Sequence, residues 1–155
     1  MQESLRTMRA KRADDDRGFT LIELLVVVVI IGVLVAIAIP LYLNYRKGAE
    51  NKSAASDVRG TVSAAEQYYT ENGNAYPADN LTSLAGASLV FAGTSPQTAT
   101  VSAGNTLRFK NNTASYWICG QNTNGGTVYV YNSATGGSVA KSTQTTLALC
   151  VTNGN

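Results

Sequence analysis

The sequence predicts an α+β protein: a long N-terminal α-helical spine, apolar in its first half, whose second half packs on a roughly four-stranded antiparallel β-sheet. Three features of the chain indicate this fold. An uncharged stretch runs from Leu24 to Leu43, and helix-forming residues continue from there to about Glu71. Short β-type runs separated by turn residues then fill most of the remaining chain.

Length and composition exclude several classes of function. The 155 residues suit one domain with at most an appendage, and the net charge of +2 is too small to favour nucleic acid as a partner. The chain has no histidine and two cysteines, so it cannot assemble the usual zinc sites or a Ser-His-Asp triad. We therefore expect neither an enzyme nor a bound cofactor or metal.

Residues 1–18 form a charged segment ahead of the apolar stretch. They hold nine of the chain's twenty-two charged residues, with five basic side chains set against Glu3 and the acidic run at residues 14–16. No apolar periodicity runs through them, so we expect a solvated arm that ends at Gly18.

The apolar segment is long enough to cross a membrane. Its twenty uncharged positions would rise about 30 Å as a helix, which matches the hydrocarbon thickness of a bilayer. Tyr42 and Tyr45 stand where an interfacial aromatic belt is expected, just before two basic residues. No small-residue cleavage pattern follows the apolar run, which disfavours an ordinary secretory signal.

Glu23 places an acid near the start of this segment, where lipid makes a carboxylate costly. No basic side chain between Phe19 and Leu43 can serve as its partner. A partner can come from another chain, or from the amine that cleavage between Gly18 and Phe19 would create four residues away. Alternatively, Glu23 is wetted at the interface and favoured there by the helix macrodipole.

Residues 18–23, with the sequence Gly-Phe-Thr-Leu-Ile-Glu, and the Val/Ile/Leu/Ala stretch after them resemble the prepilin signature of type IV pilins and pseudopilins. The resemblance is specific over residues 17–47 and concerns only the architecture elsewhere. It implies that a membrane prepilin peptidase cuts after Gly18 and N-methylates Phe19. It also implies that Glu23 pairs with the Phe19 amine of an adjacent subunit and so sets the register of assembly.

The same resemblance assigns roles to two helix breakers. Gly32 and Pro40 lie where family members interrupt the helix, and the segment between them is expected to melt locally in the filament. In the isolated subunit, Pro40 predicts an ordinary kink. The eighteen-residue leader is typical of subtype IVb and the phenylalanine start of subtype IVa, so the subtype stays open.

The helix is expected to continue over residues 47–71. Val58, Val62, Ala65 and Tyr69 recur on one narrow face, which suits a helix laid against a sheet. Gly73 follows as a C-terminal stop. Such a spine cannot bury its apolar half in a monomer, so it predicts association with other copies of the chain.

The last eighty-four residues are polar, and half of them are Asn, Thr, Ser or Gly. Residues 72–97 are expected to connect helix and sheet, with a short helical turn between Leu81 and Phe91. Residues 98–155 are expected to form a meander of about four antiparallel strands, with one face on the helix and the other in water. The β-type runs are residues 99–102, 107–110, 115–119, 127–131 and 138–141.

Cys119 and Cys150 are the only cysteines. An exported head permits a disulfide between them, and two free buried thiols are the alternative. Closing a loop of about thirty-two residues would contribute about 3.7 kcal/mol in the loop-entropy model. Pilins commonly have a C-terminal disulfide-bounded region, so the resemblance implies that the two cysteines pair.

The resemblance implies a structural subunit that polymerises through its apolar helix into a cell-surface type IV pilus for adhesion, motility or DNA uptake. The implied partners are other copies of the chain, the prepilin peptidase, and an inner-membrane assembly platform driven by a cytoplasmic ATPase. Before assembly the subunit would sit in the cytoplasmic membrane with its head outside. The alternatives are a pseudopilin of a type II secretion or competence machine, and a minor pilin whose head binds DNA or glycan through Arg108 and Lys110.

Overall fold

The computed structural model describes residues 18–78, 81–83 and 87–155, and the predicted leader over residues 1–17 lies outside this range. Within it, helix α2 (Leu21–Glu71) is followed by seven strands and a short helix, α3 (Leu147–Asn153). The strands are β1 (Leu81–Ser83), β2 (Leu89–Phe91), β3 (Gln97–Ala99), β4 (Asn105–Asn111), β5 (Tyr116–Asn122), β6 (Val128–Asn132) and β7 (Ala140–Lys141).

Helix α2 confirms the predicted spine over nearly its whole expected length. It is helical without interruption through Gly32 and Pro40 and ends at Glu71, where Gly73 and Asn74 take left-handed backbone angles. The contacts within the chain divide it into two units, Met1–Tyr42 and Leu43–Asn155. The helix is long and apolar enough to cross a membrane, by the criteria of length and composition.

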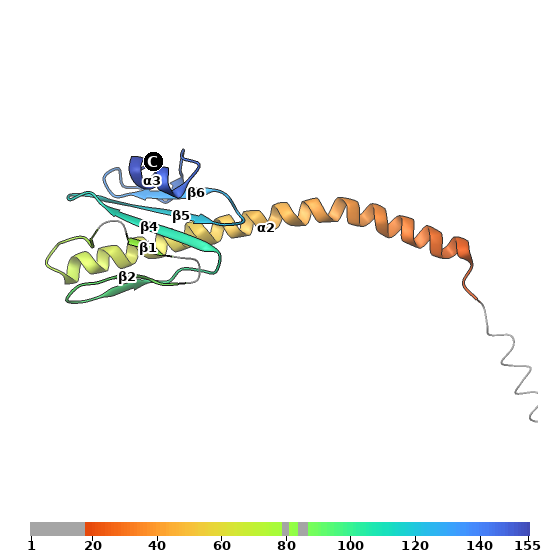
Figure 1. Ribbon diagram of the computed structural model, residues 1–155, viewed down its shortest axis with the longest axis horizontal. Helices are drawn as coiled ribbons and strands as arrows, with labels where there is room; N and C mark the ends of the chain where they lie inside the picture. The colour runs from red at the N-terminus through yellow and green to blue at the C-terminus, as the bar shows by residue number, and fades with distance from the viewer. Residues whose placement is uncertain (1–17, 79–80, 84–86) are drawn as a thin grey trace, which may run out of the picture. The chain divides into compact units, whose positions relative to one another are not determined.

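In the second unit, the buried face of α2 is narrow and made mostly of small side chains. Its buried residues are Ala54, Ala55, Val58, Thr61, Ala64, Ala65 and Tyr68. Val58 and Ala65 were predicted on this face. The structure buries Tyr68, whereas the predicted Tyr69 is only half-buried. Small side chains let the helix approach the sheet closely. Figure 1 shows this part of α2 running along β4 and β5.

The main sheet has the strand order β1-β4-β5-β6-β7, and each neighbouring pair is antiparallel. The predicted meander is therefore confirmed as β4 to β7. Its turns fall near the predicted glycines, with Gly104, Gly126 and Gly136 at positive φ.

The connector differs from prediction. The helical turn expected between Leu81 and Phe91 is wrong for the described residues, which form β1 and β2 instead. Strand β1 pairs with the edge of β4, whose backbone groups would otherwise lack partners. Strands β2 and β3 form a separate two-stranded sheet that brings Leu89, Phe91 and Ala99 into the core.

The expected strand at residues 99–102 is also wrong beyond Ala99. Ala99 pairs with Leu89 across the small sheet, and the chain then leaves the ladder. The Ser102 backbone N–H donates to the Asp57 carboxylate on α2 at 2.7 Å. The Asp57 side chain thus accepts from a backbone N–H that the predicted strand would have paired with a neighbouring strand.

Aromatic rings form the centre of the core between α2 and the sheet. Phe109 lies 5.1 Å from Phe91 and 5.3 Å from Tyr116, measured between ring centroids. The Tyr116 hydroxyl donates to the Glu66 carboxylate at 2.5 Å. Burial, followed by this hydrogen bond, raises the pKa of Tyr116, so its phenol stays protonated and remains a donor.

A buried polar cluster anchors the helix to the sheet. The fully buried Asn105 side chain donates to Asp57 at 2.7 Å and to Ser53 at 3.0 Å, and its oxygen accepts from Asn122 at 2.7 Å. Every link joins α2, β4 or β5 to another of these elements. Because unpaired amides are costly in the interior, the cluster fixes the helix against the sheet in one position.

The outer face of the sheet does not face water as predicted. Helix α3 covers it, and Cys119, Val128, Val130, Cys150 and Val151 form a second apolar cluster beneath the helix. Figure 1 shows α3 on the side of the sheet opposite α2. The apolar outward side chains of β5 and β6 required such a cover, which the strand pattern alone did not reveal.

Gly120 lies on β5 where Val58 of α2 approaches most closely. A Cβ at this position would lie 2.5 Å from Val58 Cγ2 and 2.7 Å from Leu107 Cδ2. We expect Gly120→Ala to lower the free energy of unfolding by about 1–3 kcal/mol, because the overpacked core must shift. Urea unfolding of the detergent-solubilised chain, followed by Trp117 fluorescence, measures the change.

Gly60→Ala is the matched control, since Gly60 is exposed on α2 and nothing lies within 4 Å of an added Cβ. The same substitution there should raise stability by about 1 kcal/mol through helix propensity. Equal effects of the two substitutions would contradict the close-approach explanation.

Candidate functional site

Three hydrogen bonds join Thr20 and Glu23 at the start of α2. The Thr20 backbone N–H and its hydroxyl both donate to Glu23 Oε2 at 2.8 Å, and the Glu23 N–H donates to Thr20 Oγ1 at 3.3 Å. This geometry is a capping box, which satisfies backbone donors that the first helical turn leaves unpaired. In the single chain, Glu23 therefore acts as part of a helix cap.

Sequence reasoning missed Thr20. The signal was available, because a threonine followed three residues later by a glutamate, just before an apolar run, is the usual pattern of a capping box. The geometry supports the alternative in which Glu23 stabilises the N-terminus of its own helix. It leaves the carboxylate without a cation, since α2 carries no basic side chain before Arg46.

The predicted cleavage point lies next to this cap. Phe19 is 79% exposed, and Gly18 precedes it without regular structure. Since Glu23 accepts from the N–H of Thr20, its carboxylate turns back toward the end of the helix where a Phe19 amine would be created. The pairing of Glu23 with such an amine on a neighbouring subunit, and the processing at Gly18, stay predictions.

The apolar first half of α2 offers no buried face. Its large hydrophobic side chains from Leu21 to Leu43 are between 44% and 88% exposed. Gly32 and Pro40 lie within this stretch, exposed and helical, and no neighbour lies within 4 Å of a Cβ added at Gly32. Their predicted role as melting points belongs to an assembled state and stays a prediction.

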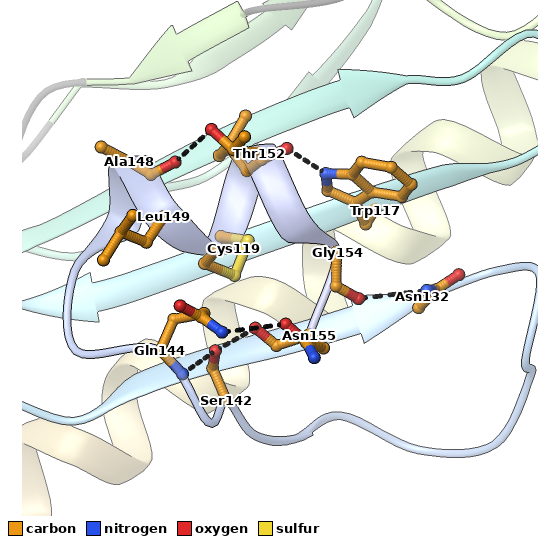
Figure 2. Close-up of a disulfide and its surroundings, with 12 residues drawn as sticks. Trp117, Cys119, Asn132, Ser142, Gln144, Ala148, Leu149, Thr152, Gly154 and Asn155 are labelled. Carbon is orange, nitrogen blue, oxygen red and sulfur yellow. Dashed lines mark hydrogen bonds between the residues drawn. A yellow bond between two sulfur atoms is a disulfide. The ribbon is translucent and has the colours of Figure 1, made fainter.

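The disulfide prediction is confirmed: Cys119 on β5 is bonded to Cys150 on α3, with their Cα atoms 6.2 Å apart. Both residues are fully buried. Figure 2 shows the bridge beneath α3, where the Trp117 indole N–H also donates to the Val151 carbonyl at 2.6 Å. The bridge and this hydrogen bond together hold α3 on the outer face of the sheet.

The chain end is held by further contacts around α3. Thr146 caps the start of the helix, and Gly154 ends it in a left-handed conformation. Asn132 donates to the Gly154 carbonyl at 3.1 Å, and the Ser142 hydroxyl donates to the Asn155 carbonyl (Figure 2). These bonds make residues 142–155 a fixed layer rather than a loose tail.

Arg108 and Lys110, proposed as a binding patch, do share the outer face of β4. In the register they lie opposite Cys119 and Trp117 of β5. Lys110 already has an interaction partner, and Arg108 Nε is buried without a hydrogen bond. Two cations at such positions make a small footprint for a polyanion.

Comparison with known families matches residues 14–39 to the prokaryotic N-terminal methylation motif. This range includes Gly18, Phe19, Thr20 and Glu23 and most of the apolar stretch. The chain carries the prokaryotic N-terminal methylation motif.

Individual relatives point the same way. The chain is 44% identical over 64 residues to the fimbrial protein EcpC of Eikenella corrodens, covering 41% of each chain. It is 36% identical over 88 residues to a type IV major pilin protein PilE1 of Neisseria gonorrhoeae, covering 57% of this chain and 41% of the relative. Against the type II secretion system core protein G of Escherichia coli K12, identity is 40% over 73 residues, covering 47% and 48%.

The chain thus spans about two fifths of the length of EcpC and of PilE1. No solved structure matches it. The similarity to these pilins extends over 64 to 88 residues, and so beyond the methylation motif.

The contribution of the disulfide to the stability of the head can be measured. Replacing both Cys119 and Cys150 by serine should lower the free energy of unfolding by about 3.7 kcal/mol, since the unfolded chain loses a loop constraint. Urea unfolding of the detergent-solubilised chain measures the loss, and the wild-type chain under strong reductant should lose a similar amount. Labelling of both thiols in native, unreduced protein would show that the pairing is absent.

Proposed function

We propose that this chain is a structural subunit of a type IV pilus, which polymerises through the apolar first half of α2 into a cell-surface filament. One observation carries the proposal: a chain with the methylation motif presents an apolar helix surface that its own fold does not cover. Lipid can cover that surface before assembly, and the same helix of other copies can cover it afterwards.

Transfer between these two environments gains little hydrophobic free energy, because lipid tails are as apolar as the helix side chains. Register must therefore come from a directional contact. In the proposed mechanism, the Glu23 carboxylate meets the N-methylated Phe19 amine of a neighbour, and the two charges attract strongly at low dielectric. The segment between Gly32 and Pro40 loosens as the helices pack together.

The proposal assigns each part of the chain a place. Residues 1–18 are removed by the prepilin peptidase, residues 19–46 anchor the subunit in the cytoplasmic membrane and later form the filament core, and residues 47–155 form the outer head. An inner-membrane platform driven by a cytoplasmic ATPase extracts the subunit from the membrane. In this proposal the chain has a structural role and no enzymatic activity.

Similarity to core protein G of a type II secretion system supports a second candidate, a pseudopilin. Both candidates use the same helix and the same motif. Deletion of the gene separates them: loss of surface filaments in electron micrographs supports the pilus subunit, and loss of exoprotein secretion with filaments intact supports the pseudopilin.

Mass spectrometry of purified filaments should detect a subunit that begins at N-methylated Phe19. A glycine before the cut lets the backbone enter a peptidase cleft without a side chain in the way. Gly18→Val should therefore leave the chain unprocessed in the membrane. Filaments built from intact 155-residue chains would contradict the processing step.

Glu23→Gln separates charge from helix capping, because glutamine can also accept the N-cap hydrogen bond. We expect cells with this variant to accumulate processed, membrane-bound monomer and to make few or no filaments. An amine left without its carboxylate in a low-dielectric interior is heavily penalised, while membrane insertion becomes no harder. Counting filaments by electron microscopy and monomer by membrane fractionation checks both effects.

Thr20→Val is the matched control. It removes the hydroxyl that bonds Glu23, weakens the cap by about 1 kcal/mol and keeps the charge. Filaments should then still form. Normal filaments with Glu23→Gln, together with their loss in Thr20→Val, would show that Glu23 acts only as a helix cap.

A further inference from the structure

A surface cavity of about 780 Å³, open to solvent, lies in the head at the C-terminal end of α2. Its walls come from the end of α2, the loop after it and the turn between β4 and β5. The lining residues are Tyr69, Asn74, Ala75, Tyr76, Ala78, Asn111, Thr113 and Ala114. This volume is typical of small-molecule sites, and none of these residues carries a charge.

Asn111 joins the two walls of the cavity. Its amide donates to the Tyr76 carbonyl at 3.4 Å and the Pro77 carbonyl at 2.8 Å, and its oxygen accepts from the Thr113 N–H at 2.7 Å. The side-chain amide of the half-buried Asn111 thus joins the loop after α2 to the β4–β5 turn. The cavity is therefore pre-formed in the free chain.

A short row of aromatic rings builds one side of the cavity. Tyr76 lies between Tyr69 and Tyr116, with centroid distances of 4.5 Å and 4.7 Å. Burial raises the pKa of Tyr76, so its phenol is a neutral donor. Tyr69 is the last ring of this row, and among the described residues no further ring covers it.

The polar groups that line the cavity are largely unused. The hydrogen bonds within the described part of the chain do not involve the side chains of Tyr69, Asn74, Tyr76 or Thr113. Two phenols, one amide and one hydroxyl are therefore available to a molecule in the cavity. Each can both donate and accept, which suits a ligand rich in hydroxyl groups.

Two residues beside the cavity take left-handed backbone angles, Asn74 just after the end of α2 and Thr113 in the β4–β5 turn. Among the described residues, Asn74 (φ 61°) and Thr113 (φ 66°) are the non-glycine residues with positive φ, and both line the cavity. This conformation is unfavourable for a β-branched residue such as threonine, and glycine would adopt it at less cost. The hydrogen bond from the Thr113 N–H to Asn111 Oδ1 holds this turn, and Thr113 itself is among the residues that line the cavity.

We propose that this cavity binds a neutral saccharide of one or two rings. The Tyr69 ring offers an aromatic face for the apolar C–H face of a sugar, while Asn74, Tyr76 and Thr113 offer partners for its hydroxyls. Phosphate, sulfate and carboxylate ligands find no cation among the lining residues. The lining includes no residue of the apolar first half of α2 and neither Arg108 nor Lys110.

Saturation-transfer NMR on the full-length chain tests the proposal. The chain is held in phosphocholine micelles, because detergents with sugar head groups would compete. The probes are N-acetyllactosamine, chitobiose and maltose, with a sulfated heparin disaccharide as the charged comparison. At least one neutral probe should show saturation transfer, and the sulfated disaccharide should bind more weakly than that probe. Since monomeric protein is used, the result does not depend on filament assembly.

Two variants locate the binding. Tyr69→Ala and Thr113→Gly should each weaken binding about tenfold, through the lost ring and the lost hydroxyl. Thr113→Gly should keep or raise the melting temperature, because it relieves the strained backbone. Tyr45→Ala, which removes an exposed tyrosine outside the cavity, is the matched control and should leave binding unchanged.

Three results would overturn the proposal: saturation transfer to none of the neutral probes, equal binding in wild type and in both cavity variants, or tighter binding of the heparin disaccharide. A loss of binding in Thr113→Gly with a lowered melting temperature would also count against it, because a damaged turn would then explain the loss.

Discussion

The uncovered apolar surface of α2 is the constraint on which the rest of the molecule depends. From Leu21 to Leu43 every large hydrophobic side chain is at least 44% exposed, around the whole circumference of the helix. Water cannot be its natural environment, because each exposed leucine or valine forgoes about 1.5–3 kcal/mol of burial. The fold of one chain leaves this surface uncovered, which fits membrane anchoring and assembly with other copies.

The head forms a stable core although half of the last eighty-four residues are Asn, Thr, Ser or Gly. A few aromatic rings supply the buried volume, and small side chains on α2 with Gly120 on β5 allow a close approach of helix and sheet. The Asp57–Asn105–Asn122 cluster then fixes the position of the helix by hydrogen bonds. The disulfide adds α3 as a second layer.

The capping box changes the energetic picture of Glu23. An acid in an apolar segment suggests an unsatisfied charge, but two donors of Thr20 already bind this carboxylate. This lowers the cost of placing it at a membrane interface. An approaching amine would therefore add a charge partner to a carboxylate that is held in place, which favours a defined register.

The sequence by itself determined the apolar span, the extent of α2, the β4–β7 meander and the identity of the methylation motif. These features depend on residues near one another in the chain, through periodicity, turn residues and local composition. The tertiary structure alone decided the pairing of β1 with β4, the separate β2–β3 sheet, the placement of α3 and the cavity beside Tyr69. Each of these joins segments distant in sequence, where competing partners differ in packing and hydrogen bonding rather than in local pattern.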